Sequence, residues 1–183
     1  MTQINHPLQN TEAFAQLFEQ NHLTVFRFIY GLSGGTLHDV EDLTAETFMR
    51  AWKARGSFEG DQRAALGWLL TIARNLVIDA TRRNKIRQVE QLTSDLDECQ
   101  QLLPYLPSES AEGQALRHEQ VGILFRQLAK LPSERRELLV LRYILGWSVK
   151  EIASHMGMLE NTVSVYLRRA IEQLRSNWPG EAL

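Results

Sequence analysis

Apolar residues recur at helical spacing along most of this chain. The first stripe has spacings of three, four and seven, typical of an amphipathic helix that buries one face; it consists of Phe14, Leu17, Phe18, Val25, Phe26 and Ile29. Asn10 is expected to cap this helix, and Gly31, Gly34 and Gly35 are expected to end it. Thr36 then caps a second predicted helix, which reaches about Arg55.

A third amphipathic helix is predicted from Leu66 to about Lys85. It follows a predicted loop over residues 56–65, which contains two glycines and no apolar period. The positions expected to point mostly inward are Trp68, Leu69, Ile72, Ala73, Leu76 and Ile78. Residues 89–112 contain prolines, serines and acids without a clear period, which predicts a linker. Because no segment alternates convincingly as a strand would, the predicted fold class is all-α.

The C-terminal part of the chain predicts a helix-turn-helix. One helix is expected to end near Leu145, and a turn at residues 146–148 leads to a short helix over 149–156. Gly157 separates this helix from a longer one that begins near Asn161. In such a layout the second helix enters the DNA major groove. The expected core positions are Leu131, Pro132, Leu138, Leu141, Ile152, Ala153 and Val163.

The formal net charge of −2 conceals a strong segregation of charge. Residues 1–50 carry a net −4 and residues 51–88 carry +5, while residues 89–116 carry −6 and residues 117–183 carry +3. Two basic blocks suit a protein with two nucleic-acid contacts, because phosphates attract local charge and not net charge. Each block taken alone is equally consistent with a solvated face.

The composition argues against several other classes of protein. The single cysteine, Cys99, permits no intrachain disulfide and suits a reducing compartment. The five histidines are scattered, so we expect no metal and no cofactor. No apolar run approaches the roughly 20 residues of a membrane span and no signal peptide is visible, so we expect a cytoplasmic protein without membrane insertion. No nucleophile or phosphate-binding loop accompanies the acids, so we expect neither an enzyme nor a small-molecule substrate.

Three segments, in this order, resemble the sigma factors of bacterial RNA polymerase. They are DVEDLTAETFMRAW at 39–52, WLLTIARNLVIDATRRNK at 68–85 and the helix-turn-helix at 131–175. The short chain without an intervening third domain resembles the extracytoplasmic-function (ECF, group IV) branch. The resemblance implies two small helical domains, which are a domain 2 bundle over residues 1–88 and a domain 4 helix-turn-helix over residues 113–183, joined by an acidic flexible linker over residues 89–112.

The acidic helix would bind core polymerase, because in sigma factors this helix docks on a coiled coil of the beta-prime subunit. Asp42 and Glu46 lie four residues apart on one face, where a basic partner would relieve the repulsion between them. The implied core-binding residues are Glu41, Asp42, Glu46 and Met49. Ala45 stands where the family commonly has Gln, and an ordinary solvated acidic face is the alternative reading of these residues alone.

The third helix and the loop before it would recognise and melt the −10 promoter element by the same resemblance. The mechanism resembles base flipping, in which a base leaves the stack and enters a protein pocket. The implied −10 residues are Phe58, Gly60, Asp61, Gln62, Arg63, Arg74, Asn75, Arg82, Arg83 and Lys85. The loop would form the pocket wall, Asn75 would contact the base, and the Arg/Lys cluster would hold phosphates. Trp68 is expected in the core, in preference to stacking on a base.

The second helix of the helix-turn-helix would contact the −35 element. The implied residues are Glu160, Asn161, Thr162, Ser164, Tyr166, Arg168 and Arg169. Ser164 and Tyr166 occupy positions that are often basic in the family, so the family's −35 preference does not transfer. The surface around Leu141, Ile144 and Leu145 is implied for the polymerase beta flap.

Together these segments indicate an alternative sigma factor that binds core RNA polymerase, directs it to specific promoters and promotes −10 melting. The implied partners are core polymerase, through its beta-prime coiled coil and beta flap, promoter DNA and an anti-sigma factor. The weakened recognition helix leaves open a sigma-like decoy that sequesters an anti-sigma protein without binding promoters. A helix-turn-helix regulator with a helical sensor domain is a third interpretation. The acidic linker either enters the RNA exit channel or serves only as a tether.

Overall fold

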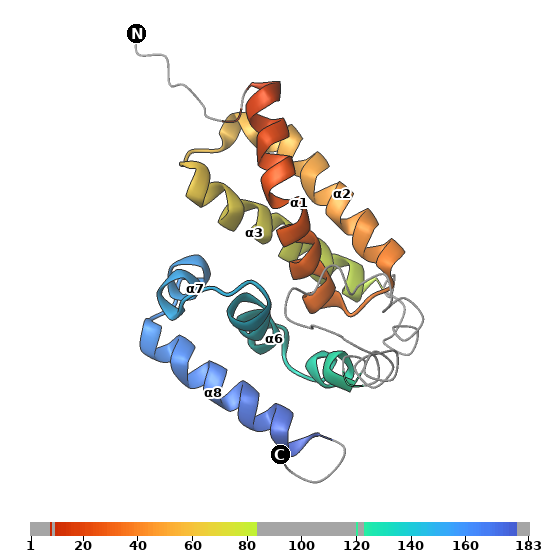
Figure 1. Ribbon diagram of the computed structural model, residues 1–183, viewed down its shortest axis with the longest axis vertical. Coiled ribbons are helices and arrows are strands. Elements are labelled where there is room, and N and C mark those ends of the chain that lie inside the picture. Colours follow the sequence, from red (N-terminus) through yellow and green to blue (C-terminus); the bar gives the residue numbers. More distant parts are fainter. Residues whose placement is uncertain (1–7, 9, 84–119, 121–122, 179–183) are drawn as a thin grey trace, which may run out of the picture.

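The described part of the chain is helical and folds into two bundles (Figure 1). The computed structural model describes residues 8, 10–83, 120 and 123–178. The N-terminal bundle comprises α1 (Thr11–Ser33), α2 (Leu37–Ala54), a 3-10 turn η1 (Arg55–Ser57) and α3 (Gln62–Arg82). The C-terminal bundle comprises a helical segment over 123–129, α6 (Ser133–Leu139), the π-helix η4 (Val140–Ile144), α7 (Val149–Met156) and α8 (Glu160–Ser176). The all-α prediction is confirmed.

Short polar side chains set where the helices of the N-terminal bundle begin. Asn10 accepts a hydrogen bond from the Glu12 amide at 3.0 Å, and Thr36 accepts one from the Asp39 amide at 3.2 Å, so both predicted caps are confirmed. Asp61 caps α3 in the same way, by accepting from the Ala64 amide at 2.9 Å. The prediction of a loop up to residue 65 was therefore wrong in its second half.

Gly31 was expected to end the first helix, but α1 continues to Ser33. The helix ends instead with Gly34, which adopts a φ of 58° and donates its amide to the Tyr30 carbonyl. This left-handed conformation suits glycine because it lacks a Cβ. Gly31 has a different role, which is to allow another helix to approach α1 closely.

The core of the N-terminal bundle lies where α1, α2 and α3 meet. Val25, Phe28, Ile29, Leu69 and Leu70 are completely buried there. The predicted stripe is confirmed in most positions of α1. Phe18, however, is 44% exposed, so its assignment to the core was wrong.

The C-terminal bundle has the expected core. Leu131, Leu138, Leu141, Ile152, Ala153 and Val163 are all buried. Pro132 is exposed, contrary to the prediction, because it precedes α6 as its N-cap residue. The helix that was expected to end near Leu145 does so as a π-helix, η4, and the turn at Gly146 follows with a φ of 73°.

One hydrophobic core runs through both bundles. Tyr30 of α1 meets Phe125 edge-on, with 4.7 Å between the ring centroids, and α1 packs against both α6 and η4. In Figure 1, α6 lies between the N-terminal bundle and α8. The predicted linker, Cys99, Lys85 and the predicted domain boundaries near residues 88 and 113 lie outside the described residues.

Candidate polymerase and DNA interfaces

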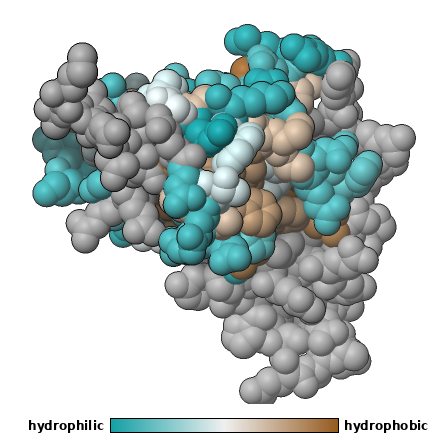
Figure 2. Space-filling model, turned by 90° about the horizontal axis from the view of Figure 1, so that it is seen from above, coloured by the Kyte–Doolittle hydropathy of each residue, from teal (hydrophilic) through white to brown (hydrophobic). Residues whose placement is uncertain are grey.

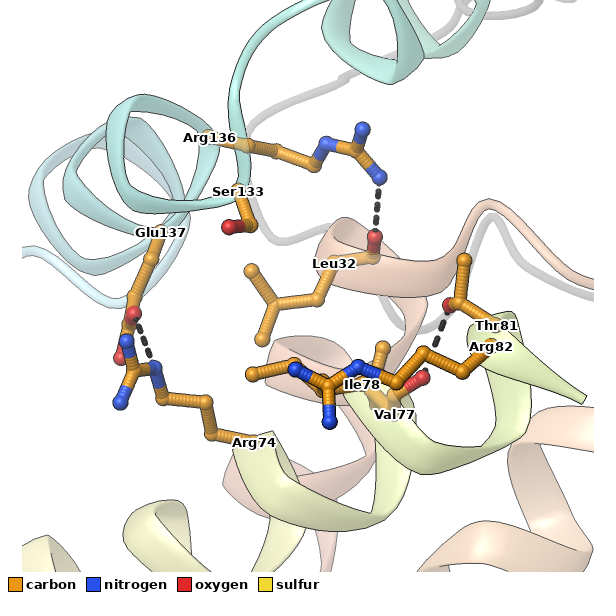
Figure 3. A pocket seen from close by; sticks show the side chains of 9 residues that line it. All are labelled: Leu32, Arg74, Val77, Ile78, Thr81, Arg82, Ser133, Arg136 and Glu137. Carbon is orange, nitrogen blue, oxygen red and sulfur yellow. Dashed lines mark hydrogen bonds and ion pairs between the residues drawn. The ribbon is translucent and has the colours of Figure 1, made fainter.

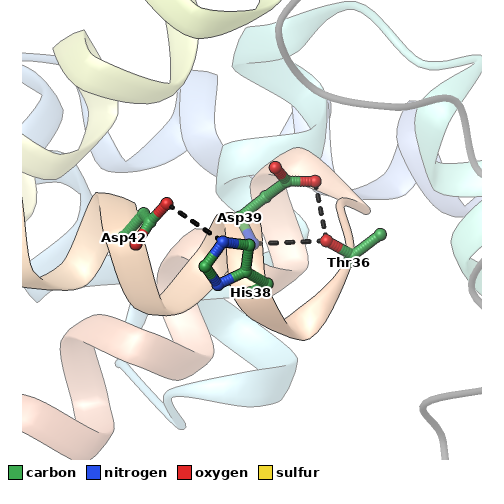
Figure 4. A network of polar contacts seen from close by, with 4 residues as sticks. All are labelled: Thr36, His38, Asp39 and Asp42. Carbon is green, nitrogen blue, oxygen red and sulfur yellow. Dashed lines mark hydrogen bonds and ion pairs between the residues drawn. The ribbon is translucent and has the colours of Figure 1, made fainter.

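The start of α2 separates the acids that hold the helix from those that face solvent (Figure 4). Asp39 belongs to the cap, because the Thr36 hydroxyl donates to its carboxylate at 2.8 Å. Asp42 has only a loose contact with His38, at 3.7 Å, and its side chain is 72% exposed. Glu41 is also exposed. Asp42 and Glu41 are therefore available to a basic partner.

The next turns of α2 combine a paired acid with an apolar side chain. Glu46 accepts a hydrogen bond from Arg50 of the same helix at 2.7 Å, while Met49 is 52% exposed. Phe18 of α1 lies beside this helix, with its ring 4.8 Å from that of Phe48. The exposed face thus offers both charge and apolar area, a combination common in protein interfaces. Its apolar contribution from α1 was missed, because Phe18 fits the buried period of its own helix.

Viewed from above, the described surface is mostly hydrophilic, with apolar side chains among the polar ones (Figure 2). None of the described helices is sufficiently long and apolar to cross a membrane. Among the described residues, no three His, Cys, Asp or Glu side chains are grouped so that they could hold a metal ion.

The predicted −10 residues are divided between the surface and the interior. Asn75, Arg82 and Arg83 are exposed on α3. Arg74 instead forms an ion pair with Glu137 of α6, with 2.7 Å between Nε and Oε2. Gln62 and Arg63 lie in the first turn of α3, and Lys85 lies outside the described residues.

The loop before α3 is packed more tightly than the sequence indicated. Phe58 is only 6% exposed, and its ring lies 4.9 Å from that of Trp68. The prediction of Phe58 as a wall for a flipped base is therefore corrected, because its ring is already buried against Trp68. An added Cβ at Gly60 would lie 2.9 Å from both Phe58 and Ala64. Gly60 therefore allows the loop to close over Phe58, and Asp61 caps α3.

A capping box fixes the first helix of the helix-turn-helix. The Ser148 hydroxyl accepts a hydrogen bond from the Glu151 amide at 3.2 Å, and the Glu151 carboxylate accepts one from the Ser148 amide at 2.8 Å. The hydrogen bonds from the Ser148 hydroxyl and then from its amide lower the pKa of Glu151. At the other end of α7, Gly157 adopts a φ of 64°, which lets the chain turn sharply into α8.

Helix α8 presents a polar outer face. Val163, Leu167 and Ala170 are buried against the rest of the bundle. The exposed residues on the predicted recognition surface are Glu160, Asn161, Ser164, Arg168 and Arg169. Thr162 and Tyr166 are half-buried, and Tyr166 packs against the core. Arg168 has a loose contact with Glu172 at 3.8 Å, so its guanidinium remains available to a phosphate or a base edge.

A helical bundle with an exposed acidic helix, joined in one chain to a helix-turn-helix, defines a class of protein that combines a protein-binding face with a DNA-binding face. Residues 17–86 match the family model of Sigma-70 region 2, and residues 122–174 match that of Sigma-70 region 4. The chain is 30% identical over 171 residues to the ECF RNA polymerase sigma factor SigX of Bacillus subtilis, covering 91% of this chain and 84% of SigX. The chain therefore belongs to the ECF RNA polymerase sigma factors.

Another relative and a solved structure agree with this assignment. The chain is 33% identical over 171 residues to the ECF RNA polymerase sigma factor BldN of Streptomyces coelicolor, covering 93% of this chain but only 62% of BldN. The sigma factor RpoE of Bartonella quintana, solved in complex with the anti-sigma factor NepR, superposes with a TM-score of 0.62 at 23% identity. This match covers 91% of this chain and 96% of that chain, and it shows that the fold is shared.

Proposed function

We propose that this protein is an alternative sigma factor that binds core RNA polymerase, directs it to specific promoters and promotes melting of the −10 region. The observation that carries the proposal is the exposed face of α2, with Glu41, Asp42 and Met49, in the same chain as the outward face of α8. The polymerase supplies the chemistry, so we assign no reaction and no cofactor to this chain. Its place of action would be the bacterial cytoplasm.

The two ends of a promoter would be recognised by different bundles. Asn75, Arg82 and Arg83 support −10 contacts, because they form an exposed polar and basic edge on α3. Arg168 and Arg169 support phosphate contacts at the −35 element, with Ser164 positioned for a base edge. We retain the division into residues 1–88, 89–112 and 113–183 as part of this proposal.

An anti-sigma factor is proposed as a further partner. RpoE of Bartonella quintana was solved in complex with the anti-sigma factor NepR, and this chain has the same fold. A protein that covers α2 would compete with polymerase for the same exposed face.

Transcription from a randomised promoter library, with purified core polymerase and this protein, tests the proposal. Wild type should yield transcripts that share −10 and −35 patterns, and Asp42→Lys should abolish them by reversing charge on the proposed polymerase face. Glu19→Lys is the matched control, since Glu19 is an exposed acid on α1 outside the predicted set. Equal transcription by Asp42→Lys and wild type would remove α2 from the proposal. Binding of an anti-sigma protein without any binding of core would favour a decoy.

A further inference from the structure

The contact between the two bundles is closer than a loose tether would give. A Cβ added to Gly31 of α1 would lie 2.8 Å from Val140 Cγ2 and 3.0 Å from Ile144 Cδ1. Real Cβ atoms do not approach other carbons at such distances without displacement of a neighbour. Helix η4 therefore packs on α1 at a place where only glycine fits.

Two arginines and a glutamate fasten this contact (Figure 3). Arg74 of α3 pairs with Glu137 of α6 at 2.7 Å, and the Glu137 side chain is 3% exposed. Burial raises the pKa of Glu137, and the charge of Arg74 offsets part of that effect. Arg136 donates to the Leu32 carbonyl at 2.7 Å. That carbonyl belongs to the last turn of α1, so Arg136 caps α1 from the other bundle.

The same contact covers groups that the proposed function needs. Arg74 belongs to the proposed −10 edge but is bound to Glu137. Leu141 is completely buried, and Ile144 packs over Gly31, although the surface around both was expected to meet the beta flap. In this arrangement neither bundle offers its whole surface to polymerase.

The arrangement also brings the two proposed DNA sites too close together. Arg74 bonds to Glu137 of α6 at 2.7 Å, and Arg135 of α6 donates to Gln173 of α8 at 2.9 Å. With about 1.5 Å per bond and per helical residue, the path from Arg74 to Arg168 spans at most about 45 Å. Promoter elements centred at −10 and −35 lie roughly 85 Å apart in B-form DNA, at about 3.4 Å per base pair. The closed arrangement therefore cannot engage both elements.

We propose that this contact, which we name the clasp and define by Gly31, Leu32, Arg74, Arg136, Glu137 and Val140, holds the free protein in an autoinhibited closed state. Release of the clasp separates the bundles, frees Arg74 and uncovers the η4 surface. This inference rests on the proposed function for its biological meaning, because the elements that must be reached are those of a promoter.

Spin labels on both bundles test the clasp without any polymerase. Lys53→Cys and Glu172→Cys lie at exposed positions, and Cys99→Ser leaves only these two thiols to be labelled. The labelled wild type should show one short distance distribution. Gly31→Leu and Glu137→Lys should each shift it to longer distances, by steric exclusion and by repulsion of Arg74 respectively. Gly56→Leu is the matched control, because no atom lies within 4 Å of a Cβ added there. Far-UV circular dichroism verifies that each variant retains its helices.

Affinity for core polymerase then tests the inhibition. A protein that binds only from its open state has its apparent Kd raised in proportion to the closed population. We therefore expect both opened variants to bind core on the order of tenfold more tightly than wild type and Gly56→Leu. Unchanged distances in folded Gly31→Leu and Glu137→Lys would overturn the clasp, and unchanged core affinity in opened variants would overturn its inhibitory role. If a closed wild type and opened variants all fail to bind core, the proposed function and the inhibition both fail, whereas the intramolecular contact stands.

Discussion

Replacing Ser148 with alanine gives a quantitative test of how the helix-turn-helix is held. Helix α7 has only eight residues, and a helix so short depends on its ends and on packing. The substitution removes the oxygen that accepts from the Glu151 amide at 3.2 Å. Loss of such a cap costs about 1 kcal/mol, which for a chain of this size lowers Tm by roughly 2–4 °C.

The pH dependence of this effect has a definite sign. The Ser148 hydroxyl and amide lower the pKa of Glu151 below its ordinary value of 4.5. A carboxyl whose folded-state pKa is depressed stabilises the fold above its unfolded pKa, and this contribution is lost as pH falls through the folded value. Ser148→Ala removes the hydroxyl's share of that contribution. The Tm difference from wild type should therefore be largest near pH 7 and should shrink below about pH 4.5.

Thermal unfolding followed by circular dichroism, at pH 7 and at a pH below 4, measures both effects. Ser148→Thr is the control, because threonine keeps the accepting oxygen. A Tm unchanged by Ser148→Ala at pH 7 would refute the cap as a source of stability. A deficit that is the same at both pH values would refute the contribution of the Glu151 charge.

Other substitutions test the core, a turn and a buried histidine. Leu69→Ala should cost about 2–5 kcal/mol in urea unfolding, because Leu69 is completely buried; a loss as small as that of exposed Thr71→Ala would contradict this. Gly157→Ala should cost about 1 kcal/mol by thermal unfolding, since Gly157 has a φ of 64°; a gain in stability would contradict the left-handed turn. Burial, and then the charge of Arg74, lower the pKa of His155. Stability should therefore be complete above about pH 6.5 and fall as pH drops, and a His155→Gln variant with the same slope below pH 6.5 would contradict this.

Local patterns in the sequence were sufficient to predict most helices and the helix-turn-helix. The caps at Asn10 and Thr36 are formed by residues within three positions of their partners, so spacing alone reveals them. The bounds of α7 were predicted well because Ser148 and Gly157 mark its two ends. The expected core of the C-terminal bundle is buried at every position except Pro132.

Features that depend on contacts distant in sequence were not predictable in this way. Gly31 was interpreted as a helix breaker, but it is needed because η4 packs on α1. Phe58 was assigned to a DNA pocket, and only the folded loop shows its ring against Trp68. The pairing of Arg74 with Glu137 joins residues from different bundles, and no periodicity within either helix indicates it.

The single core that passes through both bundles has a consequence for the lifetime of the protein. Small cores bury a smaller fraction of their surface and are less stable alone. A protein opened at the clasp would have two such cores in place of one, and would unfold in two steps in place of one cooperative transition. Proteases cleave transiently unfolded chains in proportion to their population. Molecules that leave polymerase without closing again would therefore be degraded first, so that closure also sets how long the free protein persists in the cell.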